Sequence, residues 1–136
     1  MISIKKSISA NQLVILASLY FTFIYNIPFL SRVYTAVVSQ EVYNLPFLIS
    51  VPLLLLSLVV IFLTFFSAKY VIKGALISLT IYSSLLFFST ITYGIVFDYG
   101  MVQNAIETDT AEALSYLNLH AVLFFIVFGV IPSLII

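Results

Sequence analysis

Charge is scarce in this 136-residue sequence. Charged side chains make up 7% of the residues, five basic and five acidic, whereas 63% of the residues are hydrophobic. A water-soluble domain carries about 25% charged residues, because its surface must be solvated. Ten charges cannot cover a globule of this size, so lipid must solvate most of the surface. The net charge of zero also argues against a nucleic-acid partner, which needs a concentrated basic patch.

Metal-binding side chains are equally scarce. The sequence has no cysteine, which excludes a disulfide framework and a thiolate metal site. Its one histidine, His120, cannot build a zinc or non-haem iron site by itself. We therefore expect no metal, no cofactor and no catalytic residue in this segment.

Long apolar runs without acidic or basic residues fill most of the sequence. Crossing the hydrocarbon core of a bilayer takes roughly 20 such residues. An isolated span must satisfy its backbone hydrogen bonds internally, so these runs are expected to be helices. The sequence therefore predicts an all-α integral membrane protein with about four transmembrane helices. The predicted spans are residues 11–30, 47–66, 74–97 and 119–136.

The basic residues predict how the chain is oriented. Lys5 and Lys6 precede the first span, and Lys69 and Lys73 lie between the second and third. The opposite side holds only Arg32. Because short cytoplasmic loops carry the excess of Lys and Arg, the amino terminus is expected in the cytoplasm. The loops 31–44 and 98–118 are then outside, in the periplasm if this is a bacterial inner-membrane protein.

Four of the five acidic residues fall in the second outer loop: Asp98, Glu107, Asp109 and Glu112. From residue 99 to 117, apolar and polar positions recur with helical periodicity. This pattern predicts an amphipathic helix in the periplasmic interface, between the third and fourth spans. Asp98 is expected to cap its start.

One polar row stands out on this predicted helix. Asn104, Thr108 and Glu112 are each four residues apart, so their side chains project from one face. An amide, a hydroxyl and a carboxylate together can donate to a phosphate oxygen and pair with an ammonium group. A phosphoethanolamine headgroup offers both partners. The alternative is that these residues, like Glu107 and Asp109, are simply solvated.

The same loop carries a resemblance to a known family. The stretch from residue 96 to 118 closely resembles the phosphoethanolamine–lipid A transferases, which include the mobile colistin-resistance enzymes of Gram-negative bacteria. The family's loop reads approximately D-x-x-M-x-x-N-x-x-x-T-x-x-x-E-A. Its places are filled here by Asp98, Met101, Asn104, Thr108, Glu112 and Ala113.

The resemblance implies a function that this segment would serve only in part. Family members have five membrane helices and a periplasmic domain with zinc and a threonine nucleophile. They move phosphoethanolamine from phosphatidylethanolamine to lipid A, which gives polymyxin and colistin resistance. The family residues corresponding to Asn104, Thr108 and Glu112 are implicated in holding the donor lipid. The fifth helix and the catalytic domain are absent from these 136 residues, so the segment alone is expected to anchor and to bind donor lipid.

Two other classes of membrane protein fit four helices. A small multidrug-type transporter would have a suitable size, but proton-coupled transport usually needs ionisable groups inside the spans, and the predicted spans have none. A structural subunit of a membrane assembly is the other alternative. Removing the acidic loop from such a subunit would leave its complex functional.

Overall fold

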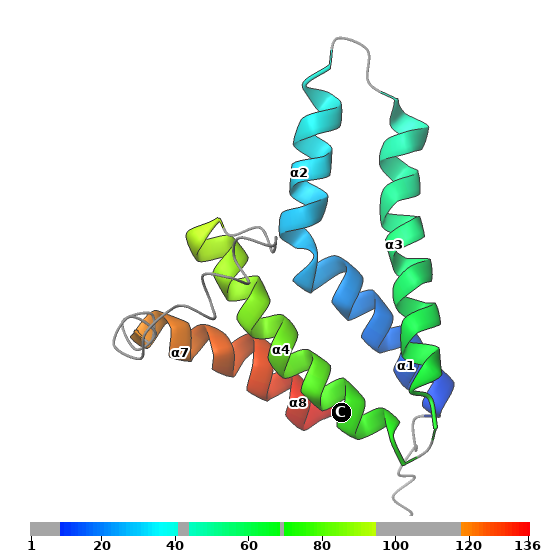
Figure 1. The fold of residues 1–136 in the computed structure, drawn as a ribbon, viewed down its shortest axis with the longest axis vertical. Helices are drawn as coiled ribbons and strands as arrows, with labels where there is room; N and C mark the ends of the chain where they lie inside the picture. Colours follow the sequence, from blue (N-terminus) through cyan, green and yellow to red (C-terminus); the bar gives the residue numbers. More distant parts are fainter. Residues whose placement is uncertain (1–8, 41–43, 69, 95–117) are drawn as a thin grey trace, which may run out of the picture. The chain divides into compact units, whose positions relative to one another are not determined.

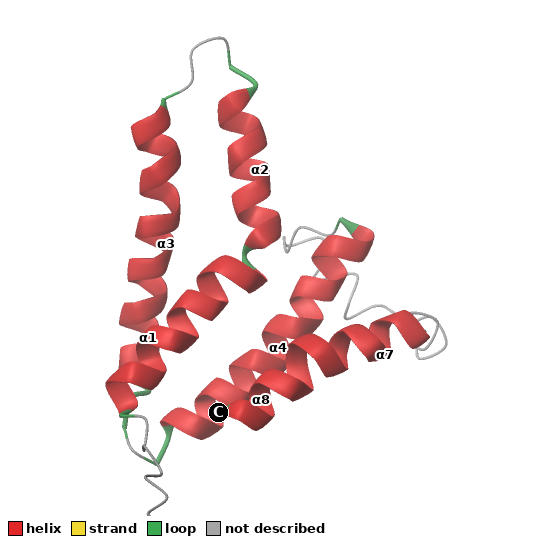
Figure 2. Cartoon of the chain, turned by 180° about the vertical axis from the view of Figure 1, so that it is seen from behind, coloured by secondary structure: helices red, strands yellow, loops and turns green. Residues whose placement is uncertain are grey.

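In a computed structural model, the chain is described at residues 9–40, 44–68, 70–94 and 118–136. These residues form helices and no strand, which confirms the all-α fold class. Contacts group the chain into two compact units, Met1–Leu76 and Ile77–Ile136. Figure 1 follows the elements along the sequence, and Figure 2 shows them from behind.

The first unit begins with a bent pair of helices. Helix α1 (Ala10–Tyr20) runs into a π-helical turn, η1 (Phe21–Tyr25), and α2 (Ile27–Val38) follows. The two arms meet at an angle of 57°. Ser9 and Gln12 close a capping box at the start of α1, in which each side chain bonds the other residue's backbone N–H.

The bend has a local cause at Asn26. Pro28 has no N–H to donate to the carbonyl of Ile24, so the helical ladder is interrupted there. The Asn26 side chain donates from Nδ2 to the carbonyl oxygen of Phe21 at 2.9 Å, which satisfies an acceptor within the π turn. The expected span 11–30 is therefore bent near its end, and the helix beyond the bend continues through residues 31–38 of the expected loop.

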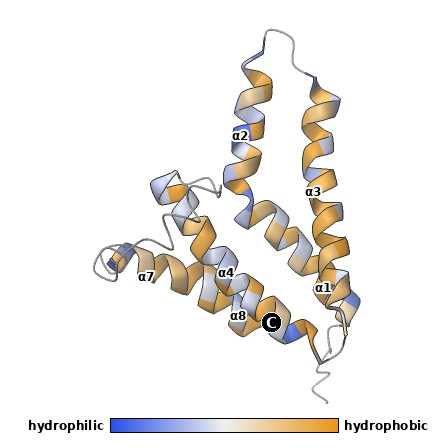
Figure 3. Cartoon of the chain, in the orientation of Figure 1, coloured by the Kyte–Doolittle hydropathy of each residue, from blue (hydrophilic) through white to orange (hydrophobic). Residues whose placement is uncertain are grey.

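Helix α3 (Leu45–Phe65) packs against both arms of this pair. Its 21 residues give a length of about 32 Å, close to the thickness of the hydrocarbon core. Asn44 caps its start by accepting from the N–H of Phe47 at 3.1 Å, and Pro46 lies in the first turn. Figure 3 shows α3 as an almost uninterrupted hydrophobic helix.

Polar side chains on α3 do not interrupt this apolar surface. Ser57 donates to the carbonyl of Leu53 at 2.8 Å, and Thr64 donates to that of Val60 at 2.7 Å. Hydroxyls bonded back to their own helix need no partner in lipid.

The second unit pairs helix α4 (Ile72–Tyr93), which starts in the first unit, with the chain's last helical stretch. That stretch comprises α7 (Leu119–Phe125), a second π turn, η2 (Ile126–Val130), and α8 (Ile131–Ile135). Helices α3 and α4 are each long and apolar enough to cross a membrane, and the bent pair gives a third candidate span. The stretch Leu119–Ile135 is a shorter apolar helix.

Candidate functional site

The predicted polar row lies outside the described residues. Asn104, Thr108 and Glu112 all belong to the range 95–117, as do Asp98, Glu107 and Asp109 and the expected amphipathic helix. What the structure describes is how the chain enters and leaves this range. Both ends belong to the second unit, so their relation can be built from its contacts.

The chain enters the acidic loop through Gly94. Helix α4 ends at Tyr93, and Gly94 has a φ of 66°, in the left-handed region. A residue in this conformation is a common way to terminate an α-helix, and glycine adopts it without strain. The helix thus stops four residues before the expected end of the third span at residue 97, because Gly94 turns the backbone out of the helix.

The chain leaves the loop through Asn118. This residue is extended, with a φ of −99° and a ψ of 168°, and its Oδ1 accepts from the N–H of Ala121 at 2.8 Å. An asparagine in this role satisfies an N–H that the first turn of a helix would otherwise leave unbonded. Helix α7 therefore starts at Leu119, the residue expected to open the fourth span.

A single ring, that of Phe88 on α4, contacts both sides of this junction. Its centroid lies 5.8 Å from that of Tyr93 at the entry end and 5.7 Å from that of His120 at the exit end. Both pairs meet edge to face, an arrangement that aromatic rings favour. Phe88 is only 8% exposed. The two ends of the acidic loop are therefore held against one buried ring.

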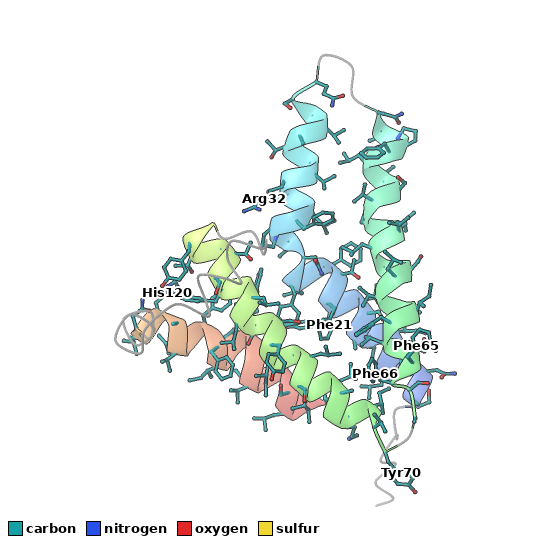
Figure 4. The ribbon with its side chains drawn as sticks, in the orientation of Figure 1. Phe21, Arg32, Phe65, Phe66, Tyr70 and His120 are labelled. Carbon is teal, nitrogen blue, oxygen red and sulfur yellow. The ribbon has the colours of Figure 1, made fainter. Side chains whose placement is uncertain are left out.

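His120 is exposed at the start of α7, where Figure 4 labels its side chain. Its ring packs edge-on against Phe88 and, at 6.5 Å, against Phe124. These contacts make His120 part of an aromatic cluster. Phe87 and Phe88, neighbours in sequence on α4, are both buried in this cluster.

Further along the helix pair, the aromatic cluster continues and then gives way to small residues. Phe87 contacts Phe124 and Phe128 at centroid distances of 5.3 Å each. At Gly129 the backbone comes close to α4, because a Cβ there would lie 2.7 Å from the Oγ of Ser84. Small residues allow membrane helices to approach in this way. The contact fixes α4 and η2 in register below the loop.

The described part of the chain offers little reactive chemistry. All five acidic residues lie outside it, and no group of three potential metal ligands occurs within it. His120 is its only imidazole. The residues described here can position a neighbouring segment, and they do not fit a zinc site.

Sequence reasoning missed two features of this region. Nothing in the sequence distinguishes Phe88 from the other phenylalanines as the contact between both loop ends. Arg32 was placed in an outer loop and instead lies in the middle of α2. The sequence does contain a signal that Arg32 lies in a helix, since Asn26 followed by Pro28 is a common way to restart a helix.

Comparison with known proteins identifies the family. The model of the phosphoethanolamine transferase EptA/EptB family matches residues 54–136. The phosphatidylethanolamine transferase Mcr-1 of Escherichia coli is 43% identical over 70 residues, which are 52% of this chain and 13% of that protein. Mcr-2 of Escherichia coli is 41% identical over 70 residues, with the same coverage. No solved structure matches. The match thus takes in about an eighth of these relatives, and the chain belongs to the phosphoethanolamine transferase family as an N-terminal membrane domain.

Proposed function

We propose that this chain anchors a phosphoethanolamine transferase in the bacterial inner membrane and presents its donor lipid, phosphatidylethanolamine. The acceptor in this proposal is a phosphate of lipid A. The chemistry belongs to a zinc-dependent periplasmic domain outside these 136 residues. The observation that carries the proposal is the family match over residues 54–136, a range that includes the polar row.

Anchoring follows from the surfaces of the helices. Large apolar side chains along α3 are exposed, among them Leu54 at 65% and Phe65 at 80%. Water would penalise such a surface, whereas lipid tails solvate it at no cost. If α3 and α4 each cross the membrane once, the connection 39–44 and the loop 95–117 face the same side. The lysine distribution supports the proposal that this side is the periplasm.

Donor binding is proposed for Asn104, Thr108 and Glu112. The Asn104 amide and the Thr108 hydroxyl would donate to the lipid phosphate, and the Glu112 carboxylate would accept from the ammonium group. The contacts of Phe88 support this proposal, because its ring touches rings at both ends of the segment that carries the polar row. A segment tethered at both ends loses less conformational entropy when it binds a ligand than one tethered at a single end.

The product explains why transfer would protect a cell. Adding phosphoethanolamine to a lipid A phosphate places an ammonium group next to that phosphate and reduces the net negative charge. Polymyxin and colistin are polycations, so their attraction to the outer surface weakens as this charge falls.

The gene provides the direct test. The complete reading frame that includes these codons should encode a fifth hydrophobic span and a soluble domain bearing a threonine and metal-binding histidines. Expressed in Escherichia coli, its product should yield phosphoethanolamine-modified lipid A by mass spectrometry and raise colistin survival. A membrane-inserted, full-length product that leaves lipid A unmodified would rule the proposal out.

A further inference from the structure

We infer that the bend between α1 and α2 is a hinge that fits the first unit to the thickness of the bilayer. The bent pair straightens in a thicker membrane and bends further in a thinner one. The inference goes beyond the proposed function, because it concerns how the anchor matches its membrane and not which lipid it presents. It can be measured without any transfer reaction.

The first step is a difference in length within the first unit. The helical path of the bent pair, from Ala10 to Val38, is about 43 Å long, whereas α3 is about 32 Å long. Both arms of the pair pack against α3, and residues 39–44 join α2 to its start. Figures 1 and 2 show α2 beside the first part of α3 and α1 beside its last part. The pair therefore follows α3 by a longer path, and the 57° bend takes up much of the difference.

The second step is the weakness of the helix at the bend. Pro28 has no N–H to donate to the carbonyl of Ile24, and η1 widens the turn just before it. A side-chain bond from Asn26 to the carbonyl of Phe21 bridges this turn at 2.9 Å. Prolines and π turns are the usual causes of kinks, because they interrupt the backbone hydrogen bonds that keep a helix straight. The angle can thus change here at less cost than within an uninterrupted helix.

The third step is a pair of buried hydroxyls beside the π turn. Ser18 and Thr22 are each 0% exposed, and neither hydroxyl has a hydrogen-bond partner among the described residues. Elsewhere in this unit, Thr35 and Thr64 donate their hydroxyl protons to carbonyls one turn earlier. Because Ser18 and Thr22 are fully buried, they can turn toward such carbonyls only if the packing around them shifts. A buried hydroxyl without a partner costs free energy, so a shifted arm would regain what this bent form gives up.

The bilayer supplies the force on the hinge. The outward surface of the pair is apolar, with Leu16 at 56%, Phe23 at 45% and Phe29 at 47% exposed. A mismatch between such a surface and the hydrocarbon core costs free energy with each ångström, and helices relieve it by tilting or kinking. Tilting the unit changes α3 and the pair together. Since their paths differ in length, tilt alone cannot match both to one thickness, and the bend angle supplies the second adjustment.

The absence of cysteine from the sequence permits spin labels at chosen positions. One double-cysteine variant replaces Asn11 and Val38, exposed residues near the two ends of the bent pair. The matched variant replaces Lys73 and Ile91, exposed residues on α4, a 22-residue helix without proline. The 136-residue chain is reconstituted in phosphatidylcholine bilayers of increasing acyl-chain length. Pulsed electron paramagnetic resonance then measures each distance.

We expect the distance between labels at Asn11 and Val38 to increase by about 3 Å from the thinnest to the thickest bilayer, as the bend opens by roughly 20°. The distance between labels at Lys73 and Ile91 should stay constant. Adding Pro28→Ala restores an N–H at the bend, so the first distance should start longer and keep less than half of the shift. Circular dichroism verifies that each variant remains helical.

Two results would overturn the inference. A distance between Asn11 and Val38 that is the same in every bilayer would show that the bend is rigid. A shift of equal size with and without Pro28→Ala would show that the chain flexes somewhere other than at this bend. Neither result bears on transfer to lipid A, so the proposed function stands or falls separately on the activity of the full-length product.

Discussion

Phe88 of α4 and His120 of α7 meet edge to face, with ring centroids 5.7 Å apart, across the two ends of the acidic loop. The contact joins residues that are 32 positions apart in sequence. Because Phe88 also contacts Tyr93, it is the point at which the entry and the exit of the loop are held together.

Replacing Phe88 should therefore destabilise the second unit. Phe88→Ala removes a ring that is 8% exposed, and we expect a loss of about 3 kcal/mol or more in the free energy of unfolding. Denaturation in detergent, followed by circular dichroism, measures it. Leu85→Ala, on the same helix but 49% exposed, is the control and should have a much smaller effect. Equal losses for the two variants would contradict the role assigned to Phe88.

The close approach at Gly129 makes a second prediction. Gly129→Ala would put a Cβ 2.7 Å from the Oγ of Ser84 and 3.1 Å from the ring of Phe125. We expect the overpacking to cost about 1–3 kcal/mol of unfolding free energy. Adding Ser84→Ala removes the nearer atom and should restore part of the loss in a double-mutant cycle.

Gly74 offers the comparison for this substitution. A Cβ at Gly74 meets nothing within 4 Å, so Gly74→Ala should be neutral or should stabilise the helix by up to about 1 kcal/mol. If Gly74→Ala and Gly129→Ala cost the same, the close contact between η2 and α4 is not what constrains Gly129.

The hydrogen bond from Asn26 to the carbonyl of Phe21 should help to hold the bend. Asn26→Leu has a similar size but cannot donate, and we expect a loss of about 1 kcal/mol of unfolding free energy. Spin labels at Ile15 and Tyr34, both exposed, should report a broader distribution of distances between α1 and α2. An unchanged distribution would mean that Pro28 alone sets the angle.

The cap at Asn118 can be tested locally. The Asn118 side chain accepts a hydrogen bond from the amide of Ala121 at 2.8 Å. Asn118→Ala should therefore lower the free energy of unfolding by about 1 kcal/mol and speed hydrogen exchange at that amide. Asn118→Ser keeps a capping oxygen and should retain most of the protection. Fast exchange at Ala121 in the unaltered protein would contradict the cap.

The polar row is tested by activity. In the full-length product, Glu112→Ala should reduce transfer to lipid A by roughly ten- to hundredfold, the worth of a hydrogen bond to a charged group. Glu107→Ala is the matched control, because Glu107 lies in the same loop and is expected to be only solvated. Lipid A mass spectrometry measures both, at equal amounts of membrane-inserted protein. Full activity in Glu112→Ala would remove Glu112 from the donor site.

The helical architecture could be predicted from the sequence because it depends on composition and run length. Asparagine caps and early prolines, as at Asn44 and Pro46, are local signals and mark helix starts well. The angle of the bend at Asn26 could not be predicted, because an apolar run continues through it and hydropathy does not register the direction of the chain after a missing backbone hydrogen bond. The contacts of Phe88 could not be predicted, since they depend on how two distant helices pack. Asn104, Thr108 and Glu112 lie outside the described residues, so both their arrangement and their role in donor binding stay predictions.

The two π turns change which residues share a face of each helix. A π turn is an α-helix that has taken in one extra residue, and each extra residue rotates everything beyond it by about 100°. Beyond Val130, the helix face that carries His120 is therefore formed by other residues than a regular 3.6-residue period predicts. Deleting one residue from 126–130 would relax the turn to a regular helix and leave Pro132 and Ser133 on the faces that they occupy now. The same deletion in α3, which has no such turn, would instead turn half of its lipid-facing surface inward.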